Sequence, residues 1–267
     1  MCVLGGITIL DKIIYLWLEL IRGTNLKINI DYLKNNISIS NINALFKEEK
    51  IEDVKLEEGI LKSFLDKNIK ERANKLYRLI EKEKLEIITI EDKKYPIQQD
   101  CPFCIVVSKG FRHNLNKRMV NIYYNSYFSK PAEVIIKYNY EIIKSLGLEV
   151  MSKYEKINSI KTGYLEKYLN SSNKDNYLFT LEDCIFFVND NTDEILFCEA
   201  IVIPEARYEN KIVSKVDYML EKSKPILIFP NSIFNKNGYF SNYLIKQGAD
   251  IILNKYDLLF ILKPLSC

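Results

Sequence analysis

The chain has 267 residues, 48% of them hydrophobic and 27% charged, which is typical of a globular protein and excludes a disordered or fibrous one. Thirty-eight lysines and arginines against 35 acidic residues leave a net charge of +3, too balanced to indicate a nucleic-acid partner from charge alone. The single histidine, His113, excludes a site that needs two imidazoles, and the nine glycines are about half the usual share of ~7%. Composition therefore favours a binding or scaffold role over loop-based phosphate chemistry.

The sequence has no segment that predicts a membrane or secreted protein. No apolar run reaches the ~18–20 residues needed to span a bilayer, and no signal-peptide pattern occurs. The six cysteines are scattered, as in proteins of a reducing compartment. Cys101 and Cys104 have the spacing of a redox or metal clip, but no second pair completes a zinc site, so we interpret them as two thiols at a strand edge. We therefore expect a cytoplasmic protein that makes no membrane contact.

The first 84 residues predict a small all-helical domain. Apolar residues at helical spacing predict its helices, at residues 14–21, 26–33, 42–46 and 57–83. Arg22 and Gly23 are typical of a helix end. The last and longest segment carries its apolar residues on one stripe and lysines and glutamates elsewhere, which predicts a helix with one solvated face.

From residue 85 the pattern changes, and residues 85–267 predict a second domain. Short apolar or β-branched runs predict strands, at residues 85–90, 105–107, 120–124, 148–151, 184–188, 200–203 and 226–229. Helical spacing predicts helices, at residues 132–146, 158–169, 211–221 and 239–246. Short strands separated by helices of about 10–15 residues indicate a parallel sheet covered on both faces. The expected fold class is therefore α/β, a Rossmann-like parallel-sheet domain preceded by a small all-helical N-terminal domain.

Three sequence stretches occur in the order of one known family. Residues 87–96, followed by Pro102 and by Ser-Lys-Gly at 108–110, are similar to that family's entry into its sheet. Residues 200–206 read Ala-Ile-Val-Ile-Pro-Glu-Ala, like its central strand. Residues 224–249 combine a strand that ends in proline, a polar loop and a helix that reads Asn-Tyr-Leu-Ile-Lys-Gln-Gly-Ala. Together these stretches resemble the DNA-processing protein A (DprA/Smf) family.

The resemblance implies a function and partners. Members of the family bind single-stranded DNA and pass it to the RecA recombinase. The resemblance therefore implies a helical (SAM-like) domain over residues 1–84 and a Rossmann-like DprA/Smf domain over residues 85–267. It also implies DNA processing in recombination and transformation, with single-stranded DNA, a recombinase such as RecA and a second copy of the chain in a homodimer as partners.

The chain departs from the family where the family contacts phosphate. Residues 125–127 read Asn-Ser-Tyr where the family has Gly-Ser-Arg, and residues 152–154 keep only the serine of the family's Ser-Gly-x-Ala motif. The family's Arg-Asn-Arg motif is matched at most by Asp-Asn-Thr at residues 190–192. We therefore expect a divergent member whose phosphate-binding motifs are degenerate.

The loops that follow the predicted parallel strands are the expected binding site, because ligands of such sheets lie beyond the carboxyl ends of the strands. The loops combine cations with tyrosines, namely Lys130, Lys153, Lys156, Arg207, Lys211, Lys215 and Lys236 with Tyr127, Tyr154, Tyr208 and Tyr239. Cations that follow a phosphate backbone and aromatic rings on which bases stack favour sequence-independent binding of single strands. We predict nucleic-acid contacts for Ser126, Tyr127, Lys130, Ser152, Lys153, Asn191, Arg207, Lys211 and Ser214.

The same residues also have purely structural explanations. Lysine and tyrosine are frequent throughout the chain, so any four loops would contain several. Ser126, Ser152 and Ser214 can each cap a helix N-terminus. His113 follows an arginine in a loop, where a solvated side chain is expected, and Glu205 at a strand end favours a structural role such as holding a loop amide.

No catalytic residue, cofactor or metal is expected, because no serine has a histidine partner in motif order and no intact glycine-rich phosphate loop occurs. The leading hypothesis is a non-enzymatic protein that binds single-stranded DNA. The alternative is a degenerate scaffold that has lost DNA binding and acts through protein contacts. A small-molecule nucleotide binder is a third hypothesis, which the low glycine count disfavours.

Overall fold

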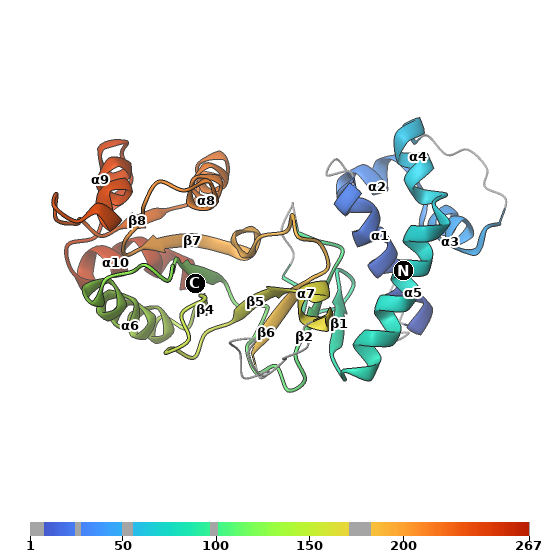
Figure 1. Ribbon diagram of the computed structural model, residues 1–267, viewed down its shortest axis with the longest axis horizontal. Coiled ribbons are helices and arrows are strands. Elements are labelled where there is room, and N and C mark those ends of the chain that lie inside the picture. The colour runs from blue at the N-terminus through green and yellow to red at the C-terminus, as the bar shows by residue number, and fades with distance from the viewer. Residues whose placement is uncertain (1–7, 25–27, 50–55, 97–100, 171–182, 267) are drawn as a thin grey trace. The chain divides into compact units, whose positions relative to one another are not determined.

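The computed structural model describes residues 8–24, 28–49, 56–96, 101–170 and 183–266 (Figure 1). The chain forms two compact units, each built from two separate stretches of sequence. The first comprises residues 1–111 and 163–193, and the second comprises residues 112–162 and 194–267.

The first unit begins with five described helices, α1 (Ile9–Thr24), α2 (Ile30–Asn36), α3 (Ile39–Lys47), α4 (Glu58–Phe64) and α5 (Lys67–Lys82). Trp17 of α1 is fully buried, and the rings of Phe46 and Phe64 lie edge-on to it at 5.2 and 5.3 Å. The expectation of one long helix over residues 57–83 is wrong. Asp66 separates α4 from α5, because its side chain accepts a hydrogen bond from the Asn68 amide and so caps the second helix.

A four-stranded sheet completes the first unit, except that the first two residues of its strand β5 belong to the second unit. Its order is β1 (Glu86–Thr89), β2 (Cys104–Val107), β6 (Cys184–Phe187) and β5 (Lys161–Tyr164), and α7 (Leu165–Asn170) follows β5. The pairs β1–β2 and β2–β6 are antiparallel, so the expectation that these strands belong to the parallel sheet is wrong. The helix expected over residues 158–169 is also wrong in its first half, because the β-branched Ile160 and Thr162 favour extended backbone and β5 forms there.

The N-terminal helices and this sheet share one hydrophobic core. Residues of α1, including Trp17 and Ile21, cluster with Ile87, Phe103 and Phe186 of the sheet region. The compact unit therefore includes strands that follow residue 84 in sequence, because the helices bury their apolar faces against these strands.

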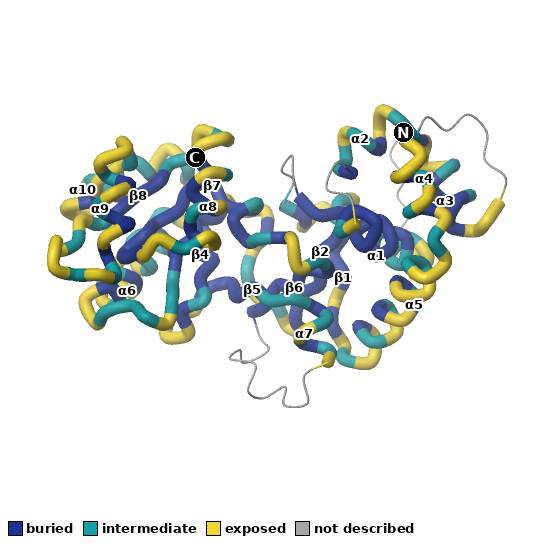
Figure 2. Tube along the Cα trace, turned by 45° about the horizontal axis from the view of Figure 1, so that its top comes forward, coloured by how far each residue is buried: buried dark blue, intermediate teal, exposed yellow. Residues whose placement is uncertain are grey.

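The second unit is a five-stranded parallel sheet in the order β4 (Glu149–Met151), β3 (Met119–Ile122), β7 (Cys198–Ile203), β8 (Ile226–Ile228) and β9 (Asp250–Ile251). Helices α6 (Lys130–Ser145) and α10 (Lys255–Leu262) cover one face, and α8 (Asn210–Glu221) and α9 (Tyr239–Lys246) cover the other (Figure 1). This arrangement confirms the expected Rossmann-like α/β class. Figure 2 shows β7 and β8 buried except at Glu199 of β7, which is partly exposed, as expected for central strands that are covered on both faces.

The strand order places a topological switch point between β3 and β7. The chain moves from β3 to β4 on one side, whereas β7 and β8 continue on the other side of β3. In open α/β sheets the loops diverge at such a point and leave a crevice at the carboxyl ends of the strands, where ligands bind.

Candidate nucleic-acid interface

Glu205 joins three loops at the carboxyl edge of the parallel sheet. It follows β7 and is fully buried. One carboxylate oxygen accepts a hydrogen bond from the Ser129 amide at 2.8 Å, and the other accepts one from the Asn235 side chain. Ser129 in turn caps α6. The loops after β3, β7 and β8 are therefore held together by a buried carboxylate, and the structural role expected for Glu205 as the holder of a loop amide is confirmed.

Arg207 and Tyr127, both predicted to bind nucleic acid, lie against each other. The guanidinium of Arg207 is 4.3 Å from the centre of the Tyr127 ring, and the Arg207 amide donates to the Tyr127 hydroxyl at 3.1 Å. The Asn237 side chain accepts from the same guanidinium and donates to the Tyr127 carbonyl at 2.8 Å. One face of the tyrosine is thus covered by a cation, while Arg207 itself remains exposed to solvent.

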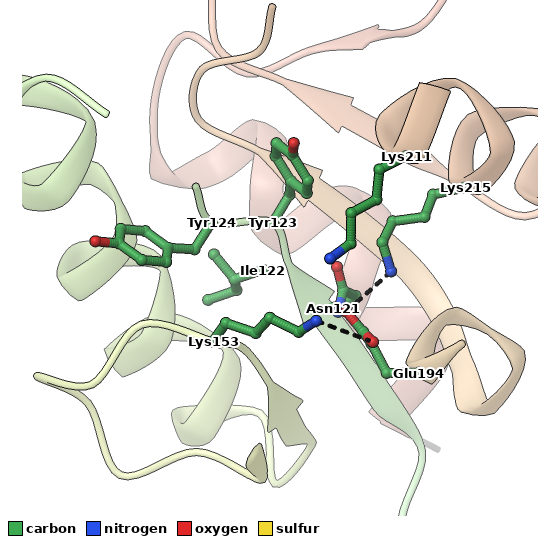
Figure 3. Close-up of a pocket in the computed structure, with 8 residues that line it drawn as sticks. All are labelled: Asn121, Ile122, Tyr123, Tyr124, Lys153, Glu194, Lys211 and Lys215. Carbon is green, nitrogen blue, oxygen red and sulfur yellow. Dashed lines mark hydrogen bonds and ion pairs between the residues drawn. The ribbon is translucent and has the colours of Figure 1, made fainter. Parts of the chain in front are cut away.

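A small pocket opens beside β3, close to the switch point (Figure 3). Lys215 of α8 lies 2.9 Å from a Glu194 carboxylate oxygen, and Lys153, which follows β4, lies 4.0 Å from the other. Thr162 also donates to Glu194, at 3.2 Å. Burial would raise the pKa of Glu194, but Lys215 and Lys153 outweigh this effect and hold the pKa at about 2.

Lys211 extends into the same pocket from the first turn of α8. Burial lowers its pKa, and the neighbouring Lys153 lowers it further, although Glu194 opposes the effect. Among the described residues Lys211 forms no ion pair. The predicted cations Lys153 and Lys211 are therefore brought together, and each adds positive charge to a pocket that already contains Lys215.

The aromatic residues of the rim divide into exposed and buried ones. Tyr208 and Tyr239 are 69% and 71% exposed, so they are available for base stacking. Tyr154 is buried and donates its hydroxyl to Glu133 at 3.0 Å, which excludes it as a stacking platform. Sequence reasoning missed Phe234, which is 89% exposed in the loop after β8; an apolar residue in a polar loop is the signal that would have found it.

None of the three serines predicted to bind nucleic acid caps a helix in the structure. Ser126 is exposed in the loop after β3, and Ser129 caps α6 in its place. Ser214 lies inside α8 and donates to the Lys211 carbonyl at 3.1 Å. Ser152 is buried and accepts a hydrogen bond from the Tyr154 amide within a turn. The capping explanation is therefore wrong for all three, and Ser126 remains exposed at the rim.

The remaining predicted residues lie in different parts of the molecule. Lys130 is exposed at the start of α6, in the second unit. Asn191 is exposed but belongs to the first unit, whereas the other eight predicted residues belong to the second.

Glu194 and Asn121, both in the pocket, were not predicted. No sequence motif marks them, because one lies in a short 3-10 turn and the other in the middle of a strand.

The residues that sequence analysis considered for other chemistry are buried. The expectation that His113 is solvated is wrong. Its side chain is 7% exposed and lies 2.8 Å from Glu149. Cys101 and Cys104 are buried, and neither forms a disulfide within the described ranges. Within the described ranges, no cluster of histidine, cysteine or acidic side chains could hold a metal ion. No described helix is both long enough and apolar enough to cross a membrane.

Solved structures with a similar fold include two proteins of one kind. DNA processing protein A from Streptococcus pneumoniae aligns with a TM-score of 0.58 at 14% identity, over 96% of this chain and 98% of its own. DNA processing protein A from Helicobacter pylori, solved for its single-stranded DNA binding mode, aligns with a TM-score of 0.51 at 15% identity, over 67% of this chain and 95% of its own. No protein-family model matches the chain, and no curated protein matches its sequence significantly. The resemblance expected from three sequence stretches is thus confirmed at the level of the fold: the chain has the fold of DNA processing protein A.

Proposed function

We propose that the protein binds single-stranded DNA without acting as an enzyme, and that it serves DNA processing in recombination or transformation by delivering the strand to a recombinase of the RecA type. The fold supports this proposal, since the Helicobacter pylori protein of the same fold binds single-stranded DNA. Four buried cysteines that form no disulfide within the described ranges support a reducing compartment, the cytoplasm.

The observation that carries the proposal is the combination of cations and exposed aromatic rings at the carboxyl edge of the parallel sheet. Lys153 and Lys211 contribute positive charge beside the switch point, and Arg207 is exposed on the linked loops. Tyr208 and Phe234 expose their rings on the same loops. A strand that crosses this edge would place phosphates near the ammonium groups and bases on the rings, which requires no particular sequence.

Fluorescence anisotropy with labelled oligo-dT tests the proposal. We expect binding at low salt whose affinity falls steeply as salt rises, because each neutralised phosphate releases counterions. Absence of binding at low salt, or binding that does not respond to salt, would contradict the proposal.

A charge-reversal variant locates the site. Changing Lys130, Lys153 and Lys211 to glutamate removes three positive charges and adds three negative ones, so the affinity for oligo-dT should fall by about two orders of magnitude or more and its salt dependence should flatten. The matched control changes three exposed lysines of α4 and α5 to glutamate, Lys62, Lys67 and Lys75. If the control weakens binding as much as the first variant, the site lies elsewhere.

A second candidate function, a scaffold that acts through protein contacts as a homodimer, is favoured by a different observation. Tyr256 and Phe260 are 68% and 83% exposed on one face of α10, and Ile251 and Leu253 are exposed at and just after the edge strand β9. Light scattering tests it. A dimer that dissociates when Phe260 is changed to glutamate would support the scaffold, and a monomer at all concentrations would exclude the homodimer.

A further inference from the structure

The residues that line the pocket beside β3 carry more positive than negative charge. Lys153, Lys211 and Lys215 contribute three ammonium groups, whereas Glu194 is the one carboxylate among the residues that line it. Figure 3 shows the lysine side chains converging on Glu194 and Asn121 from α8 and from the loop after β4. The lowered pKa of Lys211 reflects burial and then the repulsion by Lys153. An anion between Lys153 and Lys211 would relieve that repulsion.

Asn121 adds a buried hydrogen-bond acceptor without a partner to the same pocket. Its side chain is in the wall of the pocket and the residue is only 2% exposed. The amide nitrogen donates to the Met151 carbonyl at 3.4 Å, but no donor among the described residues reaches the amide oxygen. Buried acceptors are nearly always paired, and a phosphate dianion only accepts hydrogen bonds, so the donor to this oxygen would be a water molecule between Asn121 and the ligand.

The size and the charge of the pocket restrict the ligand. The enclosed part of the pocket has room for about one water molecule, so a larger group would lie at its open mouth, beside the side chains of Lys153 and Lys211. The net charge of +2 exceeds the single negative charge of a phosphodiester, whereas a phosphomonoester carries about −1.5 to −2 at pH 7.

We propose that the pocket formed by Lys153, Lys211, Lys215 and Asn121 binds a phosphomonoester, held between Lys153 and Lys211. This group occurs at a phosphorylated end of a single strand and in free mononucleotides. At a strand end, the inference rests on the proposed function and adds that the protein recognises the end of the strand as well as its backbone.

The test compares labelled oligo-dT with a 5′-phosphate, with a 3′-phosphate and with hydroxyl groups at both ends. We expect one of the phosphorylated strands to bind at least about tenfold more tightly than the hydroxyl strand, since the terminal group gains charge-assisted hydrogen bonds from two lysines. The advantage should shrink as the pH falls below about 6, where a phosphomonoester loses its second charge. Added inorganic phosphate should compete for the pocket and remove the affinity advantage of the phosphorylated strand.

Two variants show where the terminal phosphate binds. Lys211→Gln should abolish the advantage of the phosphorylated strand, whereas Lys236→Gln, a matched change of an exposed lysine outside the pocket, should retain it. Circular dichroism checks that both variants fold. If Lys211→Gln retains the full advantage, the pocket is not the site.

The outcomes separate this inference from the proposed function. Equal affinity for all three strands would overturn the inference and leave single-strand binding intact. If no strand binds, the proposed function fails, and calorimetry with thymidine monophosphate then decides the inference: binding that Lys211→Gln removes would support a mononucleotide site, and absence of binding would overturn it.

Discussion

Buried carboxylates on the parallel-sheet unit each hold cationic or amide partners. Glu149, which begins β4, accepts from His113 and Lys144 at 2.8 Å each. Burial would raise its pKa, but these two hydrogen bonds and the Lys144 charge outweigh it and hold the pKa at about 2. Among the described residues, the hydrogen-bond donors to Glu205 are neutral, a backbone amide and an asparagine side chain. Glu149 therefore stabilises the fold through its interactions with Lys144 and His113. Glu205 stabilises it through hydrogen bonds that connect loops.

Glu149 makes the stability depend on pH on the acid side. Since its pKa is lowered from 4.5 to about 2 on folding, its contribution is complete above pH 4.5 and is lost as the pH falls toward 2. That contribution is about 3 kcal/mol. We expect Glu149→Gln to lower the free energy of unfolding at pH 7 by a similar amount and to flatten its decline between pH 4.5 and 2.

Urea unfolding at a series of pH values measures both effects. Glu155→Gln is the control, because Glu155 is a glutamate of the same unit that is exposed to solvent. A Glu149→Gln variant whose stability declines with acid as steeply as that of the unchanged protein would show that another carboxylate is responsible.

At the scale of elements, the end of α1 is packed against the turn that follows β6. The Glu19 carboxylate is fully buried and accepts from the Phe103 amide at 2.8 Å and from the Asn189 side chain at 2.9 Å. One turn later, Gly23 lies so close to Asn189 that a Cβ atom would be 2.3 Å from its amide oxygen. The glycine is thus required by a close approach between a helix and a loop far along the chain.

This close approach predicts opposite effects for two glycine-to-alanine changes. Gly23→Ala should destabilise the protein by about 1–3 kcal/mol, because the new methyl group displaces an asparagine that is hydrogen-bonded to Glu19. Gly59→Ala should stabilise it by up to about 1 kcal/mol, since Gly59 lies in α4 with nothing within 4 Å of a Cβ atom. Denaturant unfolding measures both, and a neutral or stabilising Gly23→Ala would contradict the packing described.

At the scale of the whole molecule, the N-terminal helices depend on strands that follow them. The α1 core includes Ile87, Phe103 and Phe186, and the Glu19 carboxylate is satisfied partly by Phe103. A fragment of residues 1–84 would expose this apolar surface to water and leave Glu19 without those donors.

We therefore expect the fragment 1–84 to show no cooperative thermal transition by circular dichroism, whereas the full chain does. The physical reason is that a short helical segment gains most of its stability from tertiary packing. A cooperative transition of the isolated fragment would contradict this expectation and would support an independent domain over residues 1–84, as expected from the sequence.

The sequence by itself determined the helices and strands that carry a strong local signal. Residues 239–246 were predicted as a helix with the bounds that α9 has, and the apolar run at residues 200–203 forms the inner part of β7. Three stretches in order also predicted the fold. These features depend on periodicity, caps and turn residues, which act over a few residues and can be read locally.

Only the tertiary structure decided which elements pair and which side chains share a site. The apolar runs at residues 105–107 and 200–203 are alike in sequence, yet one lies in an antiparallel sheet and the other in a parallel sheet. Glu194 and Asn121 entered the pocket without a motif, because residues more than 70 positions apart meet there. Burial can be read from a local pattern, but the partner against which a residue is buried depends on the path of the whole chain.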